Sequence, residues 1–284
     1  MTLVAALSGH EGAVMFADTQ EIVAGYSKRN VDKLCVYDGQ NPLFRFAIAG
    51  ATNDATYLEN LQSEMASALR SVCTYKLGTI SDTLTAVLTS FYAKHIWPRA
   101  TDKPHMQYLV VVQPLPEGRP ETFHISETAV NVLGITTHEK SIGVGSYLAD
   151  YLIHLLLGGG EPLAQLCAAA VYVATQVREN IEGVGQVERI AMFGNEGQYD
   201  ELTLSEIMAI EQTVSPIAEV IKTSFDAMTD ISSGRLSDDD YQDAIMGNVR
   251  DIRASLGHLN ERWIEGEKRR KHLLEIYARR LSIS

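Results

Sequence analysis

The order of apolar runs and amphipathic segments along the chain constrains its fold more than any other feature. A group of short strand-like runs is followed by two segments whose apolar residues recur at helical spacing, and this order then repeats once. The strand-like runs are residues 2–8, 13–18, 32–39, 43–50, 107–115 and 121–126, and the helical segments are 53–78, 81–96, 146–157 and 161–180. Paired helices between groups of antiparallel strands predict an α+β sandwich of four layers, αββα, with two sheets inside.

Turn residues set the expected limits of several elements. The stretch Gly-His-Glu-Gly at 9–12 separates the first two runs, and glycines on each side of a two-residue tip favour a β-hairpin. The strands before residue 51 are expected to form one antiparallel sheet, and a strand at 189–194 is expected to extend one of the sheets. Ser81 or Asp82 is predicted to cap the second helix.

The chain changes character near residue 204, after which only helical patterns occur. We therefore expect two regions, a sandwich domain over residues 1–200 and a helical C-terminal extension over 201–284. Within the extension, residues 241–263 carry an apolar stripe at steps of three and four, which is close to a coiled-coil seam. Such a stripe can pack on its own domain or contact another subunit or a partner, and the sequence leaves both open.

Charge and cysteine content exclude several classes of protein. The net charge of −12 argues against nucleic-acid binding, which needs clustered lysine and arginine. Cys35, Cys73 and Cys167 are an odd number without paired spacing, so a disulfide framework is excluded and a reducing compartment is expected. With no apolar stretch long enough for a bilayer and no visible signal peptide, a cytoplasmic protein without membrane contact is predicted. The histidines lack partners at metal-ligand spacing, so neither a metal nor a cofactor is expected.

A threonine directly follows the initiator methionine. Its small side chain permits removal of Met1, which would leave Thr2 with a free α-amine and a hydroxyl on one residue. That combination places a nucleophile beside its own base. Many chains begin with Met-Thr for no catalytic reason, so a catalytic role for Thr2 depends on the other residues of the site.

Three residues at predicted strand ends supply the rest of an acyl-transfer site. Asp18 ends the second strand, Lys33 begins the third and Gly50 ends the fourth. An antiparallel arrangement can bring these strand ends to Thr2 at one edge. The Lys33 ammonium would lower the pKa of the Thr2 amine by like-charge repulsion, and Asp18 would hold and balance that ammonium. The N–H of Gly50 would stabilise the oxyanion of a tetrahedral intermediate.

In their order and spacing these residues, with Ala-Gly-Ala-Thr-Asn-Asp at 49–54, resemble the proteasome β-subunit and the peptidase of the bacterial proteasome-like two-component protease. The resemblance covers residues 2–200 and implies an N-terminal-nucleophile hydrolase fold. It further implies a threonine endopeptidase that uses Thr2, needs no cofactor and acts on polypeptides. The resemblance also implies homo-oligomers of stacked rings and an ATP-dependent unfoldase partner. The chain lacks the phosphate-binding motif GxxxxGK[ST], so the energy for unfolding must come from elsewhere.

Several positions depart from that family. Val144 replaces its serine within Gly143-Val144-Gly145, which removes a hydroxyl near the nucleophile's amine, and Lys33 falls one residue early. Glu179 occupies the position at which that family has an aspartate, and its carboxylate is expected to orient the hydroxyl and amine of Thr2. Glu182 stands at another serine and would raise the pKa of the amine by stabilising its protonated form.

The resemblance also assigns a specificity pocket for the substrate side chain. Its lining would be mostly small or apolar, which suits an aliphatic or aromatic side chain, although the glutamate would favour a basic one. The matching positions are Glu21, Val31, Cys35, Ile48, Thr52 and Thr56.

Two other functions stay open. An N-terminal-nucleophile amidase or peptide ligase with a narrow substrate would use the same residues, and a ligase would transfer its acyl group to an amine in preference to water. A non-catalytic structural ring subunit would keep Met1 and ignore threonine-directed inhibitors. The presence of Thr2, Asp18 and Lys33 together favours the endopeptidase over the structural subunit.

Overall fold

The computed structural model describes residues 2–23, 27–52, 54–99, 101, 103–133 and 139–214, with the backbone alone at 21–23 and 27–30. Contacts between Cα atoms divide the chain into two units, Met1–Ile207 and Met208–Ser284. Beyond residue 214 the predicted helical extension lies outside the described residues, and so does the whole apolar seam at 241–263. The boundary expected between residues 200 and 201 stays a prediction.

Two five-stranded antiparallel sheets form the centre of the α+β fold. The first sheet has the order β10-β1-β2-β11-β12, and the second has the order β5-β6-β7-β8-β9. The strands of the first sheet are β1 (Leu3–Ser8), β2 (Gly12–Asp18), β10 (Glu139–Gly143), β11 (Val187–Gly194) and β12 (Tyr199–Leu202). Those of the second are β5 (Leu34–Tyr37), β6 (Phe44–Thr52), β7 (Met106–Pro114), β8 (Glu121–Ser126) and β9 (Ala129–Val132). A separate hairpin consists of β3 (Gln20–Val23) and β4 (Ser27–Asn30).

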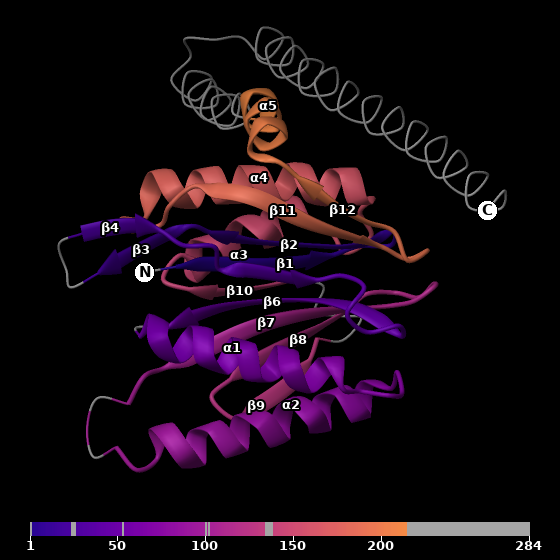
Figure 1. The fold of residues 1–284 in the computed structure, drawn as a ribbon. Coiled ribbons are helices and arrows are strands. Elements are labelled where there is room, and N and C mark those ends of the chain that lie inside the picture. The colour runs from indigo at the N-terminus through magenta and orange to yellow at the C-terminus, as the bar shows by residue number, and fades with distance from the viewer. Residues whose placement is uncertain are drawn as a thin grey trace, which may run out of the picture. The chain divides into compact units, whose positions relative to one another are not determined.

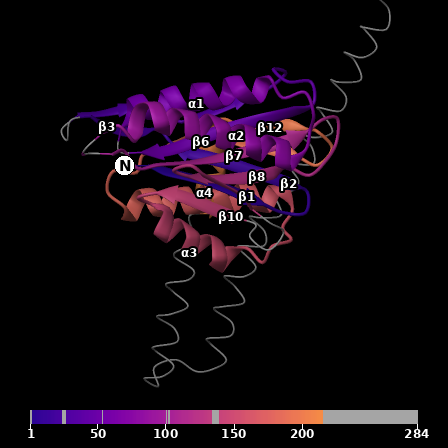
Figure 2. The same cartoon turned by 90° about the horizontal axis from the view of Figure 1, so that it is seen from below.

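Helices cover the outer face of each sheet. Figure 1 and Figure 2 show α1 and α2 on the second sheet, with α3 and α4 on the opposite side of the sandwich, beside the first sheet. The helices are α1 (Ala55–Arg70), α2 (Leu77–Phe91), the π-helical turn η1 (Tyr92–Ile96), α3 (Ser146–Leu156), α4 (Leu163–Asn180) and α5 (Leu204–Val214). No described helix is long and apolar enough to cross a membrane.

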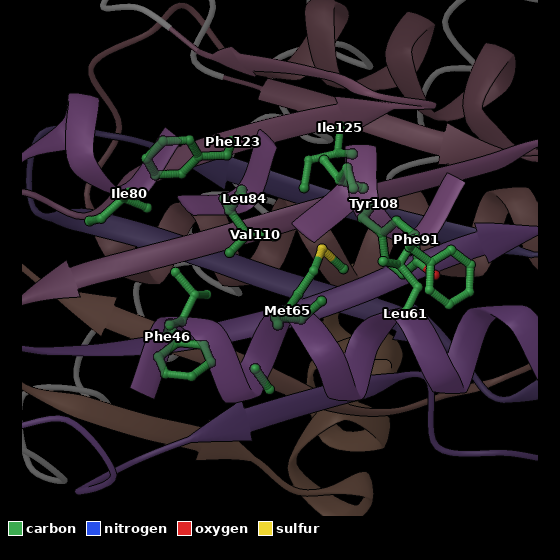
Figure 3. Close-up of a cluster of buried hydrophobic side chains, with 14 of the residues drawn as sticks. Phe46, Leu61, Met65, Ile80, Leu84, Phe91, Tyr108, Val110, Phe123 and Ile125 are labelled. Atoms are coloured by element: carbon green, nitrogen blue, oxygen red, sulfur yellow. The ribbon is translucent and has the colours of Figure 1, made fainter. Parts of the chain in front are cut away.

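Strand alternation divides the apolar residues of β6 between two cores. Phe44, Phe46 and Ile48 face α1 and α2 and belong to the outer core, part of which is drawn in Figure 3. Ala47 and Ala49 belong to the inner core between the two sheets. Successive residues of a strand point to opposite faces, which explains this division. The small alanine side chains on the inner face allow the two sheets to approach closely.

The predicted order of strands and paired helices is confirmed, but the first four strands do not form one sheet. The β1–β2 hairpin is present, with Ser8 opposite Ala13, and β2 then pairs with β11 from late in the chain. That pairing occupies the edge that β5 would need, so β5 and β6 start the second sheet. The β3–β4 hairpin, which lies between β2 and β5, was not predicted, and neither were β9, β10 and β12.

The predicted cap of the second helix is wrong. Helix α2 begins at Leu77 with Lys76 as its N-cap, so Ser81 and Asp82 lie inside the helix. The earlier start is explained by packing, since Ile80 is fully buried in the outer core and Leu77 packs against that core. Burial of these two side chains outweighs the local capping preference of serine and aspartate.

Candidate active site

Thr2 lies directly before β1 and is only 6% exposed. Its carbonyl oxygen faces the end of β10, where a Cβ on Gly143 would lie 2.1 Å from it. The amide of Gly145 donates to the same oxygen at 3.5 Å. Gly143 has a φ of +93°, so both its backbone conformation and the close approach require glycine. These two glycines fix the position of the backbone at residue 2.

The carboxylate of Asp18 is completely buried beside the start of β1. The register that places Val4 opposite Ala17 brings the end of β2 to this place. Each oxygen accepts two hydrogen bonds, and three of the four come from backbone amides. The amide donors are Leu3 to Oδ1 at 2.8 Å, Gln20 to Oδ2 at 3.1 Å and Gly185 to Oδ2 at 2.9 Å. These bonds offset the high cost of burying a carboxylate.

Lys33 supplies the fourth bond to that carboxylate and also reaches the threonine. Its Nζ donates to Oδ1 of Asp18 at 2.9 Å and to Oγ1 of Thr2 at 3.0 Å. It also donates to the carbonyl of Gln20. Both charged side chains are buried, so they attract each other more strongly than an exposed pair would. The structure therefore brings Thr2, Asp18 and Lys33 together.

This arrangement can stabilise negative charge on the Thr2 hydroxyl. An ammonium that donates to Oγ1 favours the oxygen as it loses its proton. The ammonium itself is not a proton acceptor, because its three N–H groups point to three acceptor oxygens and it has no lone pair. The proton of Oγ1 must go elsewhere, and the α-amine of the same residue is the nearest base in sequence once Met1 is removed.

Gly50 lies on β6, on the sheet that faces Thr2. A Cβ on Gly50 would lie 2.5 Å from the ring of Tyr108 and 2.6 Å from Leu58, so only glycine fits. The next residue, Ala51, has its Cβ 3.5 Å from the Cβ position of Gly143, which itself adjoins Thr2. The end of β6 therefore lies near Thr2. The oxyanion role of the Gly50 N–H stays a prediction.

Glu179 lies near the end of α4 and is exposed. Its carboxylate accepts a hydrogen bond from Nε2 of Gln176 at 3.2 Å, and within the described part of the chain no hydrogen bond joins it to Thr2. It lines a pocket of about 540 Å³ together with Glu182, Gln20 and Gly185. Glu179 therefore lies on the side of the site that holds Asp18, and its expected effect on Thr2 stays a prediction.

The residues assigned to the specificity pocket whose side chains are described differ in their exposure. Ile48 is fully buried in the outer core, so its side chain is not available to a substrate and its assignment is wrong. The strand alternation of β6 explains this, because it turns Ile48 towards α1. Val31, Cys35 and Thr52 are half-buried, Thr56 is exposed, and the side chain of Glu21 lies outside the described residues.

Val31 borders a second pocket, of about 300 Å³, that also reaches Lys33 and Arg189. Cys35 lies on β5, one residue beyond the strand's first, and burial raises the pKa of its thiol. The nearby carboxylate of Asp32 raises it further, while Arg189 acts in the opposite direction. These effects together favour the protonated form of the thiol. Among the described residues, no cluster of His, Cys, Asp or Glu could hold a metal ion.

Sequence reasoning missed the backbone donors of the site. Gly145 binds the Thr2 carbonyl, and Gly185 binds the Asp18 carboxylate. A signal was present, since Gly-Val-Gly occurs at both 143–145 and 183–185. Glycines repeated in this way often mark places where backbone must approach another group closely. Each copy ends in one of the two donors.

The comparisons with known proteins assign the fold but no family. No family model matches the chain, and no curated protein matches it. Solved structures that share the fold include Anbu from Yersinia bercovieri, described as an ancestral beta-subunit, with 15% identity and a TM-score of 0.64 over 78% of this chain and 96% of that chain. A Gly-1 mutant of Anbu from Hyphomicrobium sp. strain MC1 has 13% identity and a TM-score of 0.65 over 80% and 97%.

A third solved structure is the helical assembly of the Anbu complex from Pseudomonas aeruginosa, with 12% identity and a TM-score of 0.62 over 78% of this chain and 96% of that chain. These likenesses correct the resemblance drawn from the sequence. The chain has the fold of Anbu proteins, and this likeness replaces the proteasome β-subunit and the two-component peptidase as the group to which it is compared. At this level of identity the comparison establishes the fold alone.

Proposed function

We propose that this chain is a subunit of a homo-oligomeric complex that hydrolyses peptide bonds with Thr2 as an N-terminal nucleophile. The observation that supports this most is the Lys33 ammonium, which contacts Oγ1 of Thr2 at 3.0 Å while it is paired with the buried carboxylate of Asp18. A fold needs no buried ion pair aimed at its second residue for stability, because apolar side chains can fill the same space.

The reaction would begin after removal of Met1. Oγ1 of Thr2 attacks the carbonyl carbon of the scissile bond, and its proton passes to the α-amine of the same residue. The protonated amine then gives that proton to the leaving nitrogen as the C–N bond breaks, which leaves an ester on Oγ1. A water molecule, deprotonated by the amine, hydrolyses the ester and restores the hydroxyl. Lys33 stabilises the negative charge on Oγ1 in both halves, and Gly50 is the proposed oxyanion donor.

An unusual apolar face on α3 supports the oligomeric part of the proposal. Tyr147, Tyr151 and Leu155 follow at helical spacing and are 90%, 64% and 63% exposed. Large apolar side chains grouped in this way on a surface typically mark an interface. We assign this α3 face to contacts between copies, and the neighbour from Pseudomonas aeruginosa is itself an assembly. Polypeptide substrates would reach such an assembly with the help of a separate ATP-dependent unfoldase.

A non-catalytic assembly subunit is the second candidate. It is favoured by the same α3 face and by the neighbours, whose descriptions name a complex and an ancestral beta-subunit but no reaction. In that case Met1 would be retained, and the α-amine of Thr2 would never be free. The two candidates therefore differ in the chemical state of the chain's first residues.

Intact-mass analysis combined with covalent labelling separates these candidates. The protein is prepared in one form that starts at Thr2, through cleavage of an N-terminal fusion, and in another form that retains Met1. Both are treated with peptide epoxyketones, which capture the hydroxyl and the amine of an N-terminal threonine together. We expect one adduct per chain, located at Thr2, in the first form only. Absence of an adduct in the assembled first form would favour the structural subunit.

Two variants test the role of the lysine. Lys33→Met keeps the length of the side chain, and we expect it to slow labelling about 100-fold, as for removal of other charge-stabilising donors. Lys140→Met is the matched control, because its ammonium pairs with Asp150 at 3.4 Å in a partly exposed position. The control should label at the rate of the unmodified chain.

A further inference from the structure

Arg189 links the first sheet to the segment that carries Lys33. It extends from β11, and its Nη2 donates to Oδ2 of Asp32 at 2.7 Å and to the carbonyl of Leu34. These two partners are the residues immediately before and after Lys33. Its other terminal nitrogen, Nη1, lies 3.6 Å from the carboxylate of Glu201 on β12. One guanidinium therefore contacts the chain on both sides of the lysine that faces the nucleophile.

The position of Lys33 depends on such contacts, because residues 31–33 are not part of a strand. On one side, the amide of Val31 donates to the carbonyl of Thr19 at 2.7 Å. On the other, Oδ1 of Asp32 accepts from the amide of Leu34 at 3.2 Å, which closes a short turn around Lys33. The conformation of this turn thus depends on one main-chain bond and on the side chains of Asp32 and Arg189, instead of on a continuous ladder of strand hydrogen bonds.

We propose that Arg189 is a positioning residue that keeps the Lys33 ammonium in contact with Thr2. By binding Asp32 and Leu34 together it fixes the Cα of the residue between them, and the long lysine side chain then reaches Oγ1 from a defined origin. Arg189 does not touch Thr2, so it acts only through Lys33. Its effect on catalysis rests on the proposed function, whereas its effect on the position of Lys33 does not.

The pocket of about 300 Å³ beside this contact makes the inference testable by chemical rescue. Arg189, Asp32 and Lys33 all line it, so a small ion in solution can reach the place that a truncated arginine would leave. Guanidinium has the planar fork of donors that matches a carboxylate and a neighbouring carbonyl. Methylammonium carries the same charge without that geometry.

The experiment compares Arg189→Ala with the unmodified chain in its assembled form that starts at Thr2. Epoxyketone labelling is followed over a range of inhibitor concentrations to separate the maximal rate from the half-saturating concentration. We expect the maximal rate to fall about 100-fold, which is typical of a displacement of about 1 Å at a reacting group. The half-saturating concentration should stay unchanged. Millimolar guanidinium should restore part of the rate, and methylammonium should not.

A second measurement follows Lys33 without any catalysis. Reductive methylation with formaldehyde and a borohydride, read by peptide mass spectrometry, reports how accessible each lysine amine is. Lys33 is buried among three acceptors, so it should react slowly in the unmodified chain. In Arg189→Ala its methylation should be accelerated about tenfold or more, the change expected from about 1.4 kcal/mol of lost contacts. Methylation of Lys140 serves as the internal reference.

Arg45→Ala is the matched control for loss of a bridging arginine. Arg45 also connects separate segments, because its guanidinium contacts Asp38 at 2.6 Å, Gln113 at 2.6 Å and the carbonyl of Gly197 at 3.1 Å. Its removal should lower the melting temperature by at least as much as Arg189→Ala. It should change neither the labelling rate of Thr2 nor the methylation of Lys33.

The outcomes separate the two proposals. If Thr2 is labelled and Lys33 is methylated at the same rates in Arg189→Ala as in the unmodified chain, Arg189 does not position Lys33. If the unmodified chain never labels but Lys33 still becomes reactive in Arg189→Ala, the positioning role stands and the proposed hydrolase fails. Equal effects of Arg189→Ala and Arg45→Ala on every readout would reduce Arg189 to a general structural contact.

Discussion

The amide of Gly185 donates to Oδ2 of Asp18 at 2.9 Å across a sequence separation of 167 residues. A loop from late in the chain thereby completes the set of donors around the carboxylate that holds Lys33. The candidate site therefore depends on the pairing of β2 with β11, which places Val187 opposite Asp18 and so brings this loop to the end of β2.

The carboxylate of Asp18 should be essential for stability as well as for chemistry. Asp18→Asn removes one charge of a buried pair and turns an amide group towards backbone donors, so we expect unfolding free energy to fall by about 3–5 kcal/mol. Urea denaturation measures this loss. Asp38→Asn provides the comparison. Asp38 pairs with Arg45 but its own side chain is exposed, so this ion pair should contribute at most about 1 kcal/mol to the free energy of unfolding. Equal losses in the two variants would contradict the assignment.

Gly143 should control the position of Thr2. In Gly143→Ala the new Cβ would lie 2.1 Å from the Thr2 carbonyl oxygen, so Thr2 must move, and labelling at Thr2 should be abolished. Gly39→Ala separates this displacement from backbone strain. Gly39 also has a positive φ, of +66°, but open space around its Cβ position. The Gly39→Ala substitution should lower the free energy of unfolding by about 1–3 kcal/mol without affecting the labelling of Thr2.

The α3 face should carry the contacts between copies. Tyr151→Glu introduces a charge in the middle of this face, and a disrupted interface hot spot typically costs 2 kcal/mol or more, about a 30-fold loss in affinity. Sedimentation velocity should show smaller species for this variant at a concentration where the unmodified chain is assembled. Trp97→Glu alters an exposed apolar residue elsewhere and should leave the assembly intact. Unchanged assembly in Tyr151→Glu would place the interface on another surface.

His124 should make stability depend on pH. Burial lowers the pKa of its imidazole, Lys140 lowers it further, and Asp150 opposes them. Its Nε2 is buried without a hydrogen-bond partner in the described structure. The folded state therefore binds a proton less readily than the unfolded state. This contribution is fully present above the unfolded value of 6.5 and is lost as the pH falls towards the lower folded pKa.

Thermal unfolding from pH 7.5 down to pH 5 checks this dependence, with pH 7.5 chosen to lie about one unit above the ordinary histidine pKa. The melting temperature of the unmodified chain should drop on acidification, and His124→Gln should remove part of that drop. His10→Gln changes an exposed histidine and should keep the full slope. If His124→Gln has the same slope as the unmodified chain, another group is responsible.

The order of elements could be predicted because hydrophobic periodicity reports which face of each segment is buried. The short apolar runs that became β1, β2, β6 and β7, and the helical spacing in α1, are local properties of the sequence. The assignment of strands to sheets could not be predicted in this way. That β2 pairs with β11 instead of continuing to β5 depends on partners far away in the chain.

Within the site, the sequence determined which functional groups the chain contains, and the tertiary structure decided which of them come into contact. Thr2 and Lys33 directly precede strands and Asp18 ends one, so their side chains can converge, and their types, order and spacing together predicted acyl-transfer chemistry. The contacts of Gly185 and Arg189, and the burial of Ile48 away from any substrate, followed only from sheet register and packing. The physical reason is that a residue's type and local period are fixed by its neighbours in sequence, whereas distances of about 3 Å between remote segments are set by how the whole core packs.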